Sequence, residues 1–338
     1  MGIPRRDLFR RESGTIRAGW RLAGFLLVLF ALTFAALLLL RAVGLDPERP
    51  GKGSPDPVAE FAFTIAGVAV LLLALHRYLR HVERRGLATT GLSLRKSAIP
   101  ELAWGALIGA APVVLSVTIL APLGIARVTP SADTLASRLS AEAWMGYGTT
   151  TFGSAYEELL MRGYILQLLV EGAGSWIGAL VTGLFWAAGH IANPGSNVAG
   201  IVFTGMSGVL LAWIVIRTGS LWFAIAYHVA WNMVAAHVLG LTTSGFDLGA
   251  SLFSTTLAGP ELLTGGNYGF EGSIVTELLD LAGLSTALFL TTRWPRDEQS
   301  APHYARPIAA PPPAPAPPES SASPESSASP ESGQPPSP

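Results

Sequence analysis

The sequence predicts an all-α protein, a polytopic membrane helix bundle of about eight transmembrane helices. Its 338 residues are 50% hydrophobic and only 13% charged, whereas a soluble domain carries roughly 25% charged residues. The mean hydropathy is +0.43, and apolar stretches long enough to span a bilayer recur along the chain. Lys and Arg also concentrate in alternate connections between these stretches, as they do in multi-pass membrane proteins.

The composition excludes several classes of function. The net charge is −1, so no basic field attracts nucleic acid, and we expect no nucleic-acid partner. Cysteine is absent, which rules out disulfides, thiolate metal sites and cysteine nucleophiles. We expect the partners to be the lipid bilayer and a protein or peptide substrate within it.

The N-terminal segment 1–19 is basic, and an apolar run then extends from Trp20 to Leu40. This run is of membrane-spanning length and longer than the core of a signal peptide, so we interpret it as a retained first helix. Residues 20–297 form the predicted transmembrane domain. Its eight predicted spans are 20–44, 57–76, 101–125, 144–170, 174–192, 197–216, 220–240 and 273–292.

The fourth span is the least apolar, because it contains Glu157, Glu158 and Arg162. We keep it as a span because Thr149 to Val170 contains no proline, which favours one continuous helix.

Positive charge predicts the orientation. With eight spans, one side of the membrane receives the N-terminal segment and most other basic residues, and the opposite side receives few. We therefore expect a cell-membrane protein with both termini cytoplasmic. The basic residues on the predicted cytoplasmic side are Arg5, Arg6, Arg10, Arg11, Arg17, Arg21, Arg77, Arg80, Arg84, Arg85, Arg95, Lys96, Arg217, Arg293 and Arg296.

Residues 298–338 differ abruptly from the rest of the chain. They are rich in Pro, Ser and Ala, and the unit SSASPE repeats. This composition offers too little apolar surface to form a core, so it predicts a disordered cytoplasmic tail.

Ionisable residues within a span are costly and persist when they are paired or functional. Glu158 and Arg162 are four residues apart on one helix and can pair. Glu157 points about 100° away, with Met161 as its neighbour one turn on. The pair is therefore predicted to be structural, and Glu157 is the carboxylate suited to accept a proton.

Two later spans carry further polar groups. His190 lies near the end of the fifth span among small and apolar residues, which let a neighbouring helix approach closely. His228 and Asn232 are four residues apart on the seventh span, so one face offers an imidazole and an amide. Other acidic residues lie near span ends and are expected to reach the interface: Glu60, Glu101, Glu277 and Asp280.

These residues resemble the CPBP family, which comprises the CAAX proteases and the Abi bacteriocin-processing enzymes. The family pattern is Glu-Glu-x-x-x-Arg, Phe-x-x-x-His and His-x-x-x-Asn on three helices of an eight-helix domain. The first motif matches at 157–162 and the third at 228–232, whereas the second has Trp186 where the family has Phe. The resemblance covers about residues 143–240.

The resemblance implies peptide-bond hydrolysis within the bilayer. Glu157 would be the general base on a water that His190 helps to hold. His228 and Asn232 would donate hydrogen bonds to the developing oxyanion, and Glu158 and Arg162 would support them. Prenylated CAAX-type proteins, leader peptides and other membrane-associated proteins are the substrate classes that the resemblance implies.

A metal is a separate question, because the family is often described as intramembrane metalloproteases. The chain lacks the His-Glu-x-x-His sequence of zincins. Zinc is possible if Glu157, His190 and His228 supply three ligands from different helices. We favour glutamate chemistry that requires no cofactor.

Two alternatives come from other functional classes. Buried Glu, His and Arg side chains also serve ion- or proton-coupled transporters, although no internal repeat of the transporter kind is evident in the sequence. The second alternative is a non-catalytic membrane scaffold or immunity protein in which the polar groups only join helices.

Overall fold

The computed structural model describes residue 9 and residues 16–46 and 56–304 of the chain. It has a helix at each of the eight predicted spans, so the predicted helical membrane bundle is confirmed as a fold class. The N-terminal segment before residue 16, apart from residue 9, and the chain after residue 304 lie outside the described residues. The elements are α1 (Ala18–Ala42), α2 (Pro57–Tyr78), α3 (Ala98–Leu120), β1 (Ala126–Pro130), α4 (Leu135–Arg138), α5 (Ala141–Glu158), α6 (Leu166–Ala173), α7 (Ser175–Gly189), α8 (Val198–Thr218), α9 (Trp222–Asn232), β2 (Phe253–Leu257), α10 (Glu261–Thr264), α11 (Ile274–Leu290) and α12 (Ala301–Tyr304).

Within the described ranges, five helices are long and apolar enough to cross a membrane: Ala18–Ala42, Pro57–Glu83, Ala98–Leu120, Val198–Thr218 and Ile274–Arg293. The other three predicted spans differ in composition or length. The fourth runs through α5, a π-helical segment Leu159–Ile165 and α6, and contains the motif charges. The fifth, α7, has 15 residues, and the seventh is α9 with its π-helical continuation Met233–Val238.

Local signals in the sequence explain where several helices begin and end. Asp56 caps α2 by accepting a hydrogen bond from the Val58 amide at 3.0 Å, with Pro57 at the first helical position. Asn197 caps α8 through the Gly200 amide at 2.8 Å. Gly219 ends α8 with a φ of +68°, a conformation that glycine adopts without strain.

Glycines bring two pairs of helices into close contact. A Cβ at Gly105 or Gly109 of α3 would overlap backbone carbonyls of α9. Gly183 of α7 packs on α8, where a Cβ would come within 2.8 Å of the Gly205 carbonyl oxygen. Because helices with small residues at their interface approach closely, α9 and α7 are held firmly in the bundle, and these helices carry His228 and Trp186.

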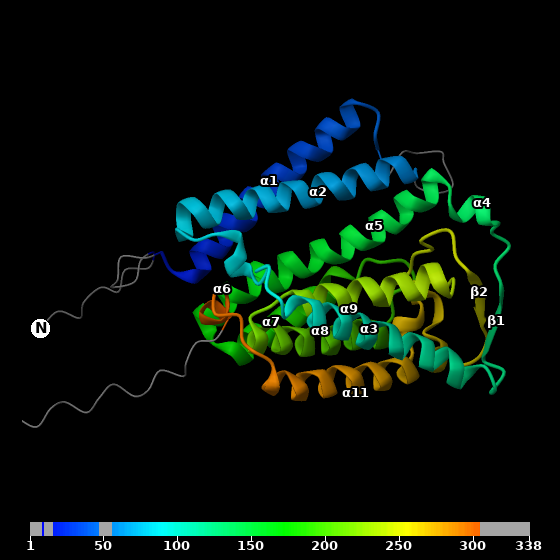
Figure 1. Cartoon of the computed structure of the whole chain (residues 1–338). Coiled ribbons are helices and arrows are strands. Elements are labelled where there is room, and N and C mark those ends of the chain that lie inside the picture. Colours follow the sequence, from blue (N-terminus) through cyan, green and yellow to red (C-terminus); the bar gives the residue numbers. More distant parts are fainter. Residues whose placement is uncertain (1–8, 10–15, 47–55, 305–338) are drawn as a thin grey trace, which may run out of the picture. The chain divides into compact units, whose positions relative to one another are not determined.

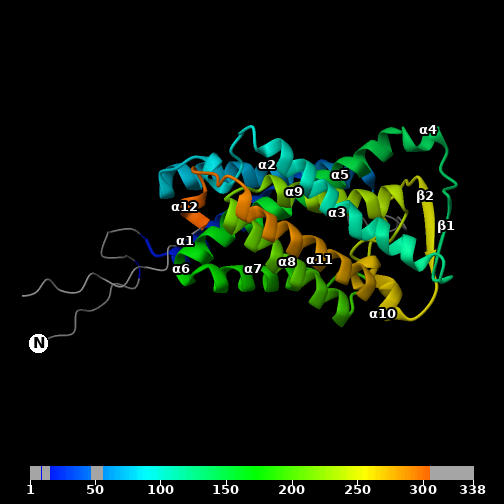
Figure 2. The same cartoon turned by 60° about the horizontal axis from the view of Figure 1, so that its bottom comes forward.

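A two-stranded sheet is a departure from the purely helical prediction. β1 and β2 pair antiparallel, with Ala126 opposite Leu257 and Pro130 opposite Phe253. The strands lie at one end of the bundle, and α6 and α12 lie at the other (Figures 1 and 2). The third span was predicted to reach residue 125, but α3 ends at Leu120, because Pro122 and Gly124 follow.

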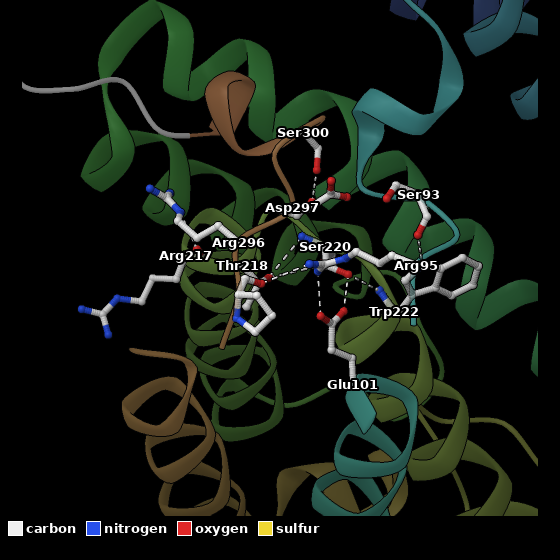
Figure 3. A network of polar contacts seen from close by, with 12 residues as sticks. Ser93, Arg95, Glu101, Arg217, Thr218, Ser220, Trp222, Arg296, Asp297 and Ser300 are labelled. Atoms are coloured by element: carbon white, nitrogen blue, oxygen red, sulfur yellow. Dashed lines mark hydrogen bonds and ion pairs between the residues drawn. The ribbon is translucent and has the colours of Figure 1, made fainter. Parts of the chain in front are cut away.

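At the end of the bundle away from the strands, a polar network fixes the turn between α8 and α9 (Figure 3). Glu101 accepts hydrogen bonds from Arg95 at 2.7 Å and from Ser220. The Trp222 indole donates to the Ser93 carbonyl at 2.9 Å, and the Arg296 Nε donates to the Arg217 carbonyl at 2.8 Å. Glu101, which was expected to reach the membrane interface, is only 3% exposed at this end of the bundle.

A second set of contacts at this end joins α1 to the end of the fourth span. Arg21 pairs with Glu83 and Glu171, and Tyr164 donates to Glu83 at 2.6 Å. Residues 298–304 were predicted to begin the disordered tail, but they include α12, and the fully buried Tyr304 packs into the bundle and donates to the Thr90 carbonyl at 2.6 Å.

Candidate functional site

The first motif forms the ion pair that its spacing predicted. Arg162 Nη1 donates to Glu158 Oε1 at 2.9 Å, and both side chains are completely buried. Arg162 Nη2 also donates to the Gly208 carbonyl of α8 at 3.4 Å. The pair lies where α5 passes into its π-helical segment at Leu159, and π turns of this kind often occur at functional sites.

Trp186 joins the first motif to α7. Its indole Nε1 donates to Glu157 Oε2 at 2.8 Å, and the Arg162 guanidinium lies 4.1 Å from its ring centroid, in a cation–π contact. Glu157 has no partner on its own helix, as predicted, but α7 supplies one. A Phe at this position would keep the ring and lose the donor, so the departure from the family pattern adds a hydrogen bond.

His190 follows the last residue of α7. Its Nδ1 lies 2.8 Å from the Trp186 carbonyl oxygen, and only a protonated nitrogen can bond to a carbonyl. The hydrogen therefore lies on Nδ1, and a neutral ring presents the Nε2 lone pair.

His228 and Asn232 lie on one face of α9. His228 Nδ1 lies 3.1 Å from Glu158 Oε1, and its ring makes an edge contact with Trp186 at 5.4 Å between centroids. Asn232 Nδ2 donates to Ser154 Oγ of α5 at 3.0 Å. α9 passes into a π-helical segment directly after Asn232, as α5 does after Glu158.

One cavity brings these side chains together. It is an open cavity between α5, α7, α9 and the connection that follows α9, and its empty space, counted together with the part open to solvent, is about 1070 Å³. Glu157, His190, His228 and Asn232 all line it, whereas Glu158 and Arg162 lie behind the wall. The remaining lining is Thr149, Thr150, Gly153, Ser154, Leu160, Met161, Phe185, Trp186, Gly189, Asn193, Thr243, Ser244, Phe246 and Leu248.

The sequence prediction missed some residues at the site. Glu277 and Asp280 were expected near the interface, but they are 4% and 1% exposed. Asp280 accepts hydrogen bonds from Ser207 at 2.6 Å and from Tyr227 at 2.7 Å. Their position inside a span was the signal that could have revealed them.

The connection between α9 and α11 covers the site and contributes polar groups of its own. Ser244 donates to Glu271 through its amide at 2.8 Å and its hydroxyl at 2.6 Å. Burial raises the pKa of Tyr268 in this connection to about 12, so its phenol stays protonated at neutral pH. The Asp133 carboxylate ties the connection to the β1–α4 loop by accepting from the Ser251 amide at 3.0 Å.

Each side chain that was weighed as a zinc ligand has one polar atom engaged in a hydrogen bond. Glu157 accepts from Trp186, His190 Nδ1 bonds a carbonyl, and His228 Nδ1 bonds Glu158. Between residues 16 and 304, leaving out 47–55, no three His, Asp or Glu side chains are grouped so that they could hold a metal ion. Chemistry that requires no cofactor stays a prediction, and we derive no step through a metal.

Comparison with known families identifies the segment that carries the site. Residues 139–234 match the family described as type II CAAX prenyl endopeptidase, Rce1-like. This match confirms the resemblance to the CPBP family, and at the level of the family it supports endopeptidase activity in a membrane. No curated protein and no solved structure matches the chain significantly.

Proposed function

We propose that this protein is an intramembrane endopeptidase in which Glu157 activates water. The observation that carries the proposal is the shared cavity: Glu157, His190, His228 and Asn232 come from α5, α7 and α9 and line the same space. The three motifs lie within or beside the matched segment 139–234, and the cavity is large enough to admit a stretch of peptide.

The hydrogen bonds around Glu157 and His190 suit them to hold one water molecule. Glu157 Oε2 is bonded to Trp186, and Oε1 is the oxygen that accepts from water. The neutral His190 ring accepts the second water hydrogen at Nε2, because its Nδ1 is protonated. A water that donates to both turns an oxygen lone pair toward the scissile carbonyl.

The reaction then follows without a covalent enzyme intermediate. The water oxygen bonds to the carbonyl carbon as Glu157 takes its proton, and the carbonyl oxygen becomes an oxyanion. Protonated Glu157 delivers the proton to the amide nitrogen, the carbon–nitrogen bond breaks, and a carboxylic acid and an amine leave.

His228 and Asn232 are placed to stabilise the oxyanion. Asn232 uses one of its two amide hydrogens on Ser154 and retains the other for substrate. His228 bonds Glu158 through Nδ1, and in its doubly protonated form the ring would donate to the oxyanion through Nε2. Arg162 neutralises Glu158 and keeps this arrangement in place. Donors of this kind are each worth about a hundredfold in rate.

The substrates that we propose are prenylated CAAX-type proteins, leader peptides or other membrane-associated proteins, cleaved without a metal cofactor. The test is cleavage of quenched peptides, including prenylated CAAX peptides, by the purified full-length protein. Glu157→Ala and His228→Ala variants are run beside the wild type, each with and without a strong zinc chelator.

We expect cleavage by the wild type, its loss in both variants, and no effect of the chelator. Cleavage that survives in Glu157→Ala would refute the proposed base, and loss on chelation would refute the metal-independent mechanism. If the folded wild type cleaves no peptide but moves protons across liposomes in a Glu157-dependent way, the transporter alternative replaces the proposal.

A further inference from the structure

A second, smaller cavity adjoins the main one. Its empty space is about 430 Å³, counted together with the part that is open to its surroundings. Trp186, His190, His228 and Ser244 line both cavities, so these four residues form the common wall. The inner cavity is otherwise lined by Thr204, Ser207, Tyr227, Trp231, Glu271 and Glu277.

The two cavities together are rich in carboxyl groups. Glu157 lines the main cavity, and Glu271 and Glu277 line the inner one. Among the residues that the structure describes, no Lys or Arg lines either cavity. Arg162, the buried cation behind the wall, already pairs with Glu158. A buried carboxyl group with no basic neighbour favours a cationic occupant.

Glu277 is the carboxylate that such an occupant would meet. The side chain is 4% exposed, lines the inner cavity, and its Oε1 has no hydrogen-bond partner among the described residues. Glu271 differs, because Ser244 and the Trp231 indole already bond it. A buried acceptor without a partner loses its hydration and forms no hydrogen bond in exchange. A donor that reaches the Glu277 carboxyl group through the inner cavity would therefore be stabilised there.

The aromatic residues that line the inner cavity also suit a cationic group. Trp186, Tyr227 and Trp231 present aromatic rings to the inner cavity, and aromatic faces attract ammonium and guanidinium groups. A metal ion fits less well, since no three ligating side chains are grouped within the described ranges. A carboxylate with aromatic neighbours instead suits the charged end of a long side chain.

We propose that the inner cavity is a specificity subsite that binds the ammonium or guanidinium group of a substrate Lys or Arg. The inference rests on the proposed function, because the side chain would enter from the main cavity while its backbone lies beside Glu157. Glu277 accepts the cationic hydrogen bond, and the aromatic rings contact the aliphatic stem. The enzyme then prefers substrates with one basic residue at a fixed distance from the cleaved bond.

The first test uses a library of quenched peptides in which each position carries Lys, Arg, norleucine or Glu in turn. Norleucine matches the Lys stem but lacks the ammonium. We expect Lys or Arg at one position to raise kcat/KM about tenfold or more over norleucine. Glu277→Gln should reduce that ratio to near one. The matched control is Glu60→Gln in the first turn of α2, which lines neither cavity and should keep the ratio.

The second test measures binding without cleavage. Saturation-transfer NMR compares n-butylammonium with n-butanol on the wild type and both variants. We expect transfer to n-butylammonium that is lost in Glu277→Gln and kept in Glu60→Gln. If Glu277→Gln does not fold, competitive inhibition of wild-type cleavage by n-butylammonium, and not by n-butanol, replaces it as the decisive result.

The outcomes separate this subsite from the proposed function. Cleavage with no preference for a basic residue at any position overturns the subsite and leaves the protease intact. Binding of n-butylammonium that depends on Glu277, without cleavage of any peptide, supports the subsite and overturns the protease. Equal transfer to both probes, or transfer unchanged by Glu277→Gln, overturns the subsite.

Discussion

Buried charged residues occur in two regions of this bundle, and the hydrogen bonding of their carboxylates differs. At the α8–α9 turn, both oxygens of Glu101 are bonded, to Arg95 and Ser220 (Figure 3). Beside the cavities, Glu158 Oε2 and Glu277 Oε1 are buried without partners among the described residues. The first region also leaves Asp297 Oδ2 without a partner among the described residues, but only in the second region do such oxygens lie beside a cavity. Burial of charge alone therefore does not mark a functional site, but unmet hydrogen-bonding capacity beside a cavity does.

The strongest test of this comparison is to replace one glutamate by glutamine in each region. Glu157→Gln keeps the acceptor for Trp186 but removes the base, so we expect cleavage to fall about a hundredfold or more with little change in Tm. Glu101→Gln leaves Arg95 uncompensated and should lower the free energy of unfolding by about 2–3 kcal/mol, while kcat changes little. Peptide cleavage and thermal unfolding in detergent measure both. Similar losses of activity in the two variants would contradict the distinction.

A narrower change tests the donor that Trp186 adds to the site. Trp186→Phe keeps a ring over Arg162 and removes the hydrogen bond to Glu157. We expect kcat to fall about tenfold with KM nearly unchanged, because the loss concerns the base and not substrate binding. Trp186→Leu, which also removes the cation–π contact, should lower the Tm as well. An unchanged kcat in Trp186→Phe would show that the indole does not position Glu157.

Packing behind Trp186 gives a smaller expected effect. A Cβ at Gly208 would lie 2.7 Å from Trp186 Cε3 and 3.3 Å from Arg162 Nη2. Gly208→Ala should therefore cost about 1–3 kcal/mol of stability by overpacking and reduce cleavage by displacing Trp186. Gly19→Ala is the control, since its Cβ would have nothing within 4 Å. Equal Tm values for the two variants would show that Trp186 and Arg162 shift to accommodate the added methyl group without a loss of stability.

The smallest expected effect concerns the connection over the cavity. The Ser251 amide and the Ser131 hydroxyl hold the pKa of Asp133 below its usual range. A carboxyl with a lowered folded pKa contributes stability above its unfolded pKa, near 4, and loses it as the pH falls through the folded value. The protection of the Ser251 amide from hydrogen exchange, measured relative to its intrinsic exchange rate at each pH, should thus fall below about pH 4, and Asp133→Asn should remove that dependence. The same fall in Asp133→Asn would assign it to another group.

The helices and the motif ion pair could be predicted because they depend on local pattern. Apolar length placed a helix at every predicted span, and the i, i+4 spacing of Glu158 and Arg162 placed them in contact. Hydropathy could not show the β1–β2 pairing, because the two strands are far apart in sequence.

By itself, the sequence determined the fold class, the family resemblance and the candidate chemistry, because these follow from composition, helical periodicity and motif spacing. Only the tertiary structure decided which groups meet between helices: Trp186 with Glu157, His228 with Glu158, and Glu277 with the inner cavity. Such contacts depend on how closely α7, α8 and α9 approach and on their rotation about their axes. Interhelical glycines such as Gly109 and Gly208 set that approach, and no periodicity along a single helix encodes it.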